Sequence, residues 1–228
     1  MILIPPQNPI PPFVDIVGKY WVLKKDEHIS NHSKWHGDIA YDRLFIDLPE
    51  LNLMPKGSLA IDVGAFIGDT ARIFLNKGFS VKAFEAQKDA FICLRHNCPE
   101  SENHRCPIGD GRMVSLFKSD SGNMGGRPVQ NGNEIQSRKL DDFMPEIIPP
   151  TFLKIDVEGF EPAVLDGAKK LLSSPNLKFV VIEFNPHALI RFGWTCEDIS
   201  KHFYGWNHRE IHRSGDEIMG NWDWIYWR

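Results

Sequence analysis

One stretch of this chain, residues 59–68, limits the possible fold more than any other. It reads Leu-Ala-Ile-Asp-Val-Gly-Ala-Phe-Ile-Gly and leads directly into a segment with helical character, Asp69–Lys77. An apolar run that ends in a glycine-rich turn before a helix is typical of a buried parallel strand in an α/β fold. The first N–H groups of such a helix are available to an anionic group. We therefore expect a nucleotide-type cofactor to bind at this turn.

A second acidic residue, Glu85, supports this interpretation. It ends the next apolar run, Val81–Glu85, and follows Asp62 by 23 positions. A ribose-binding carboxylate is expected about 20 residues after such a turn. The turn lacks the Gly-x-Gly-x-x-Gly pattern of dinucleotide sites, so S-adenosylmethionine fits it better than a nicotinamide dinucleotide. A turn that serves only strand–helix packing is the alternative.

Strand and helix patterns alternate through the rest of the chain, which predicts a parallel sheet with helices on both faces. Residues 119–136, rich in Gly, Asn and Ser, are expected to form a long surface loop, with a lid as one hypothesis. The predicted strands are 59–63, 81–85, 104–108, 113–118, 152–157 and 179–184, with 208–213 and 222–227 as a terminal antiparallel hairpin, and the predicted helices are 37–48, 69–77, 88–97, 161–172 and 195–203.

The composition fits a single globular unit. The chain has 228 residues, 42% of them hydrophobic, enough for a large core. We divide it into an N-terminal arm and substrate-side segment, residues 1–57, and a Rossmann-like domain, residues 58–228. The net charge of −4 argues against broad nucleic-acid binding. No run could span a bilayer, and the apolar start is too short and proline-rich for a signal peptide, so a cytoplasmic protein is expected.

A second group of charged residues lies in the block Phe152–Pro162. Lys154, Asp156 and Glu158 alternate, so they share one side of a strand for as long as it continues. Buried charges need a partner or a ligand. We expect these residues to line a cleft, with Asp156 acting on cofactor or substrate and Glu158 as a base or part of a divalent-metal site. A structural ion pair between Lys154 and a carboxylate is the alternative.

Two further features offer candidates for proton transfer or metal binding. His187 follows the strand that ends near Glu183, and its imidazole could accept a proton near neutral pH. A solvent-facing histidine is the alternative, and Glu183 is the better candidate to line the pocket. Cysteines 93, 98 and 106 lie near His96 and His104, but their spacing matches no standard zinc motif, so no metal ligand is assigned.

The chain resembles the FkbM-type methyltransferases, a branch of the S-adenosylmethionine-dependent Rossmann-like enzymes. The resemblance extends from about residue 59 to about residue 204, and its most specific element is Lys-Ile-Asp-Val-Glu-Gly-Phe-Glu, residues 154–161. The matching segments are 61–68, 84–86, 94–97, 108–110, 139–142, 153–161 and 181–184.

The resemblance implies a seven-stranded sheet of order 3-2-1-4-5-7-6, S-adenosylmethionine as methyl donor, and a hydroxyl of a sugar or other small molecule as acceptor. By the same resemblance Glu85 would hold the ribose hydroxyls, and Asp156 and Glu158 would lie between cofactor and acceptor. The predicted cofactor-binding residues are Asp62, Gly64, Ala65, Phe66, Gly68, Asp69, Glu85, Ala86, Asp110 and Asp156, and the predicted catalytic residues are Lys154, Asp156, Glu158 and His187.

Other functions remain open at this point. A methyltransferase that acts on an RNA ribose or cap, and a non-catalytic S-adenosylmethionine-fold binding protein, are the main alternatives. A divalent cation is an additional candidate cofactor. We expect a small-molecule or glycan acceptor, no membrane partner, and a homo-oligomer if the proline-rich arm, residues 4–12, packs on a neighbouring subunit.

Overall fold

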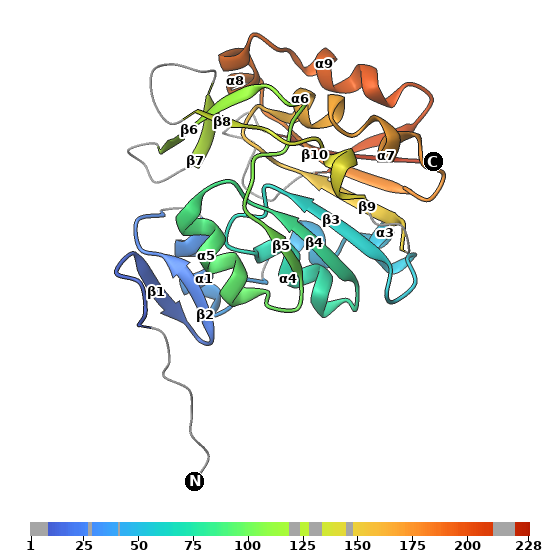
Figure 1. Ribbon diagram of the computed structural model, residues 1–228. Helices are drawn as coiled ribbons and strands as arrows, with labels where there is room; N and C mark the ends of the chain where they lie inside the picture. Colours follow the sequence, from blue (N-terminus) through green and yellow to red (C-terminus); the bar gives the residue numbers. More distant parts are fainter. Residues whose placement is uncertain are drawn as a thin grey trace.

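The structure, a computed structural model, describes residues 9–26, 29–40, 42–118, 124–127, 134–144, 148–211 and 222–228. Its centre is a seven-stranded sheet of order β11-β12-β10-β9-β3-β4-β5, of which Figure 1 labels β10, β9, β3, β4 and β5. β12 runs antiparallel to both neighbours, and the other pairs are parallel. The predicted strand order and the C-terminal antiparallel hairpin are thereby confirmed. The strands are β3 (Leu59–Val63), β4 (Ser80–Phe84), β5 (Glu102–His104), β9 (Pro150–Ile155), β10 (Phe179–Phe184), β11 (Asn207–Ile211) and β12 (Trp222–Trp227).

Helices cover both faces of this sheet because the central strands are apolar on both sides. In β9, Leu153 packs into one core cluster and Phe152 into the opposite one. Full burial of such a side chain contributes about 1.5–3 kcal/mol. The first face packs against η1 (Leu140–Phe143), α6 (Glu161–Asp166), α7 (Lys169–Ser173) and α9 (Cys196–Ser200), and the second against α2 (Arg43–Ile46), α3 (Pro49–Asn52), α4 (Asp69–Asn76) and α5 (Lys88–Asn97).

The chain before β3 folds differently from the prediction. The prediction of a helix at 37–48 is wrong. The helix α1 (Ile29–His36) stops before Gly37, whose φ of +68° breaks it, and α2 covers only four residues. A hairpin of β1 (Val14–Val17) and β2 (Tyr20–Leu23) lies beside α5 (Figure 1). Side chains from α2 and α3 join the same core as β3 and α4. The division of the chain at residues 57 and 58 stays a prediction.

The segment 119–136 is only partly described, and its described portions are strands. β7 (Met124–Arg127) and β8 (Glu134–Gln136) pair antiparallel with β6 (Met113–Lys118) in a separate three-stranded sheet. The expectation of a continuous loop is therefore wrong for these residues, since pairing with β6 supplies the order that their own weak apolar pattern does not. The lid hypothesis for residues 119–136 stays a prediction, and residues 119–123 and 128–133 of this segment lie outside the described residues.

Two smaller departures concern where elements begin and end. The helix expected at 161–172 is divided into α6 and α7 at Gly167, where a Cβ would lie 2.0 Å from the Gly109 carbonyl oxygen. The third parallel strand forms at β5 and not at 104–108. The helix expected at 195–203 begins as predicted, with a capping box between Thr195 and Asp198. Among the described helices, none combines the length and apolar character needed to cross a membrane.

Candidate functional site

The register of the sheet places several charged residues on one face at the carboxyl edge of the parallel strands. Asp62 of β3 lies opposite Lys154 of β9, and Glu183 of β10 lies opposite Asp223 of β12. Asp156 follows Lys154 by two positions, and its backbone N–H continues the ladder to the Val63 carbonyl at 3.0 Å. Paired residues, and residues two apart in a strand, point to the same face of a sheet. We call these five residues the charged row.

Lys154 connects two carboxylates of the charged row to the turn after β3. Its Nζ lies 3.3 Å from Asp62 Oδ1 and 3.6 Å from Asp156 Oδ2, and it donates a hydrogen bond to the Gly64 carbonyl at 2.9 Å. Within the described residues, neither Asp62 oxygen accepts a hydrogen bond of ordinary geometry. Burial raises the pKa of Asp62, and the charge of Lys154 opposes that effect. The contacts of Lys154 therefore match the alternative interpretation of the sequence, a structural ion pair between Lys154 and a carboxylate.

The glycine turn is fixed by contacts within the protein. The N–H groups of Gly64 and Ala65 both donate to the Phe84 carbonyl at 3.0 Å. Gly64 has φ +82°, and a Cβ there would lie 1.8 Å from the Asp156 carbonyl oxygen. A Cβ at Gly68, φ +94°, would lie 2.8 Å from Cys98 Sγ. Both glycines thus satisfy a packing requirement, whether or not a ligand also approaches the turn.

Glu85 holds the outer part of the same turn. Its Oε2 accepts a hydrogen bond from the Phe66 N–H at 2.9 Å, and its Oε1 accepts one from the Gln87 N–H at 2.6 Å. Phe66 has φ +46°, an uncommon conformation for a residue with a side chain. Burial raises the pKa of Glu85 to about 7 despite these two bonds. The spacing of Glu85 predicted its place at a strand end, but nothing in the sequence indicated its contact with Phe66.

Asp69, the first residue of α4, adds another carboxyl group to this region. Burial raises its pKa to about 7, and the charges of Asp62 and Asp42 act in the same direction, while Lys154 opposes them. The charge of Lys154 also opposes the rise in the pKa of Glu85 that burial causes. Acidic groups on β3, α4 and the end of β4 therefore act on one another around a single lysine.

The loop after β9 is organised by a residue that we did not single out for a role. Glu161 is fully buried, and its Oε1 accepts hydrogen bonds from the Val157 N–H at 3.0 Å and the Gly159 N–H at 3.1 Å. Glu158 has φ +58° inside this loop. The strand expected at 152–157 ends earlier, at Ile155, so the alternation with Lys154 does not extend to Glu158. The signal for Glu161 was its position just before the proline of a helix start.

Further acidic residues extend the charged row toward the C-terminal hairpin. The pKa of Glu183 lies well above its usual value, first because the side chain is buried and then because of the charges of Asp156, Glu158, Glu161 and Asp223. Each of these groups is therefore close enough to act electrostatically on Glu183. Sequence reasoning placed Glu183 at the pocket but missed Asp223, which reaches the same edge on an antiparallel strand.

The remaining predicted residues lie around this centre. His187 is exposed on the short helix α8 (Pro186–Leu189), and Ala86 is half-buried between β4 and α5. Asp110 accepts hydrogen bonds from Arg112 Nε at 2.9 and 2.8 Å. Burial raises the pKa of Asp110, but the hydrogen bonds from Arg112 lower it, and the pKa lies below its usual value. In the described ranges, no three or more His, Cys, Asp or Glu residues are placed to hold a metal ion.

Comparisons with known proteins agree with this architecture. A family model described as "Methyltransferase FkbM domain" matches residues 62–211. No curated protein matches the chain significantly. Among solved structures, magnesium protoporphyrin IX methyltransferase of Synechocystis PCC 6803, with bound S-adenosylmethionine, is 10% identical, with a TM-score of 0.53 over 89% of this chain and 84% of that one.

A second solved structure gives the same result. An rRNA methylase of Streptococcus thermophilus is 12% identical, with a TM-score of 0.50 over 81% of this chain and 92% of that one. At identities this low the similarity shows the fold alone. The family match covers the glycine turn, the charged row up to Glu183, and the loop that Glu161 organises.

Proposed function

The chain belongs to the FkbM family of S-adenosylmethionine-dependent methyltransferases, and we propose that it methylates a hydroxyl group of a sugar or other small molecule. The observation that carries this proposal is the effect of Asp156 and Glu158 on Glu183, whose pKa lies well above its usual value. Methylation of a hydroxyl releases one proton. Glu158, a carboxylate whose charge acts on Glu183, is the acceptor that we propose for that proton.

The acidic groups around the glycine turn suit a cationic cofactor. S-adenosylmethionine carries a sulfonium and an ammonium group, and when bound it supplies an electrophilic methyl group. Asp62 and Asp69 both have raised pKa values, first because they are buried, and a neighbouring cation favours their ionised forms. We propose that Asp62, with Gly64 and Ala65, binds the methionine portion, and that Asp69 adds negative charge beside it.

Glu85 is our candidate for the ribose hydroxyls. Each of its oxygens accepts one backbone N–H, from Phe66 or Gln87. A carboxylate oxygen can accept a second hydrogen bond, so both keep capacity for a hydroxyl donor. We propose that Phe66, Gly68 and Ala86 border the adenosine portion and that Asp110 approaches the adenine amino group.

The acceptor side of the site is proposed to lie over Asp156 and Glu158. When bound, S-adenosylmethionine would supply the methyl group to the acceptor oxygen, and a carboxylate of this loop would take the hydroxyl proton. Alignment of the two reactants supplies a large share of the rate enhancement in such a reaction. We propose Glu158 as the base and Asp156 as the group that orients the acceptor. Lys154 holds Asp62 and Asp156 in place, and the exposed His187 is the alternative base.

A divalent cation offers a second way to lower the pKa of the acceptor hydroxyl. The two candidate ligands are Asp156 and Glu158, because both are carboxylates on the loop after β9. Turnover that survives exhaustive chelation, and does not rise when Mg²⁺ or Mn²⁺ is restored, would exclude this role.

The test of the proposal joins binding to turnover. S-adenosylhomocysteine is titrated calorimetrically into the purified protein, and methyl transfer from labelled S-adenosylmethionine is measured on a panel of sugars and other hydroxyl compounds. We expect Glu158→Gln to lower kcat by about 100-fold, at the lower end of general-base effects, with unchanged S-adenosylhomocysteine affinity. Glu197→Gln, an exposed carboxylate on α9, serves as control.

Two outcomes would overturn the proposal. The first is unchanged turnover in Glu158→Gln together with normal activity of the wild type. The second is transfer to RNA but to no small molecule, with an affinity that falls steeply as the salt concentration rises.

A further inference from the structure

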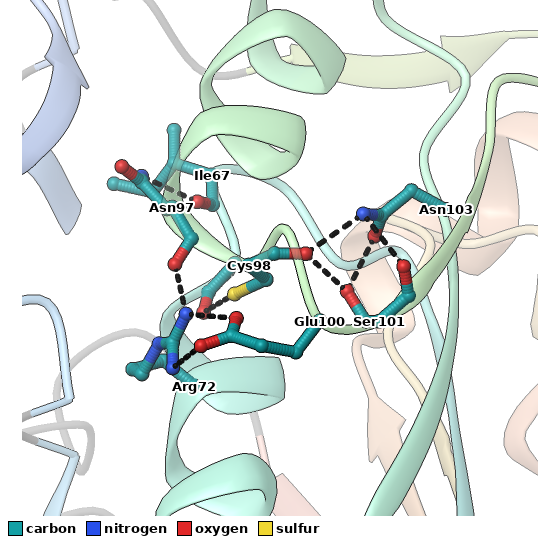
Figure 2. Close-up of polar contacts among 8 residues, drawn as sticks. Ile67, Arg72, Asn97, Cys98, Glu100, Ser101 and Asn103 are labelled. Carbon is teal, nitrogen blue, oxygen red and sulfur yellow. Dashed lines mark hydrogen bonds and ion pairs between the residues drawn. The ribbon is translucent and has the colours of Figure 1, made fainter. Parts of the chain in front are cut away.

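Asn97, the last residue of α5, links the glycine turn to a part of the chain outside the family match. Its Nδ2 donates to the Ile67 carbonyl at 2.8 Å, as Figure 2 shows, and also to the Trp21 carbonyl at 2.8 Å. Its Oδ1 accepts from the Trp21 N–H at 2.7 Å. The residue is only 2% exposed. Both amide protons and one acceptor site are therefore used within the protein.

The hairpin that Asn97 holds packs directly on the glycine turn. Val14, Val22 and other buried side chains of the β1–β2 hairpin form one cluster with Ile67 and with Ala90 of α5, and Phe66 packs against its edge. The hairpin ends with β2 at Leu23, well before the matched region begins at residue 62. The turn thus contacts both Glu85 and a hairpin from outside the matched region.

A second set of contacts ties α4 to the same end of α5. The Arg72 guanidinium donates to the Asn97 carbonyl, and its Nη2 lies 2.8 Å from Glu100 Oε2 (Figure 2). Cys98 Sγ lies 3.4 Å from the Gly68 carbonyl oxygen. Because α4 begins at the end of the turn, these contacts fix that end of the turn relative to α5.

We propose that Asn97 is a positioning residue that makes the β1–β2 hairpin part of the cofactor site. Its side chain fixes the Ile67 carbonyl relative to strand β2. It thereby holds Phe66 in the conformation in which the Phe66 N–H donates to Glu85. The inference rests on the proposed binding of S-adenosylmethionine at this turn. Coupling between two elements is reciprocal, so a cofactor that stabilises the turn also stabilises the hairpin.

Hydrogen–deuterium exchange of the wild-type protein tests this coupling without any substitution. We expect saturating S-adenosylhomocysteine to slow exchange in peptides that cover the turn, residues 64–68, and also in the hairpin, residues 14–23. Strand β11, at the far edge of the sheet, serves as control and keeps its exchange rate. Slower exchange at the turn without any change in the hairpin would overturn the inference. No change at the turn would instead contradict the proposed cofactor site.

A matched pair of variants provides the second test. Asn103 lies in the same network (Figure 2), but its Nδ2 donates to the Cys98 and Ser101 carbonyls, not to the turn. We expect Asn97→Ala to weaken S-adenosylhomocysteine binding about tenfold, within the range of coupled sites, and to raise KM for S-adenosylmethionine with little change in kcat. Asn103→Ala keeps wild-type affinity.

Both variants are compared at a temperature at which circular dichroism shows each to be folded. Equal, wild-type affinity in the two variants means that Asn97 only stabilises the fold, and the inference is then wrong. If Asn97→Ala does not fold, the exchange experiment on the wild type decides.

Discussion

The Lys154 ammonium lies 3.3 Å from the Asp62 carboxylate, at paired positions on adjacent parallel strands. The same ammonium donates to the Gly64 carbonyl. One side chain of β9 therefore neutralises a buried acid of β3 and also fixes the start of the glycine turn. The contact explains how a carboxylate as buried as Asp62 is retained at the centre of the sheet.

Loss of Lys154 is expected to be costly. Lys154→Met leaves Asp62 buried beside Asp156 without its cation, and breaking a buried pair from one side typically costs about 3–5 kcal/mol. Urea unfolding at pH 7 measures the change. Lys169→Met removes an exposed lysine that lies 3.3 Å from Asp166 and is expected to cost less than about 1 kcal/mol. Equal losses in the two variants would contradict a special role for the Lys154 contact.

Gly64→Ala tests the packing of the turn. Gly64 and Gly57 share a φ of +82°, but a Cβ at Gly57 meets nothing within 4 Å, whereas one at Gly64 would lie 1.8 Å from the Asp156 carbonyl oxygen. Gly57→Ala is expected to cost about 1–2 kcal/mol, the strain of a left-handed conformation. Gly64→Ala should lower the midpoint of thermal unfolding much further or prevent folding, and similar midpoints for the two would show that the turn yields easily.

Cofactor affinity is expected to rise with pH through neutrality. Burial raises the pKa of Glu85 to about 7, so the group is largely protonated at pH 6 and ionised at pH 8. A ribose hydroxyl donates to the ionised form, so S-adenosylhomocysteine binding should tighten across this range, by at most about tenfold per pH unit. Calorimetry at several pH values measures this, and the dependence should be smaller in Glu85→Gln. An affinity that is flat with pH in the wild type would contradict the assignment.

The stability of the cofactor-free protein should fall as the pH rises toward neutrality. Burial raises the pKa of Glu85 and of Glu161 from 4.5 to about 7, so folding favours their protonated forms. Their contribution is complete below about pH 4.5 and is lost as the pH rises to about 7. Urea unfolding should show a smaller decline between pH 5 and pH 8 in Glu161→Gln than in the wild type. Identical pH profiles would show that Glu161 does not titrate in this range.

Glu161 also allows a test of loop organisation. Glu161→Gln keeps an oxygen that can accept from the Val157 and Gly159 N–H groups, whereas Glu161→Ala leaves both donors without that acceptor. Unmade buried hydrogen bonds cost about 1–3 kcal/mol each. We therefore expect Glu161→Ala to be clearly less stable than Glu161→Gln in urea at pH 7. Equal stability would mean that water or another group satisfies the two N–H donors.

The sequence by itself determined the central sheet. Short apolar runs at 59–63 and 179–184 are typical of strands buried on both faces, and the first of them ends in a glycine turn before a helix. The order of the strands followed from the family resemblance. The strand and turn patterns are local, so a single sequence carries them.

Only the tertiary structure decided which groups meet. Asp223 reaches the charged row because an antiparallel strand brings it back to the carboxyl edge, and β7 becomes a strand because β6 pairs with it. Asn97 contacts Trp21, 76 positions earlier. Such contacts depend on the register between segments distant in sequence, and the energies that fix this register come from packing, which no local pattern specifies.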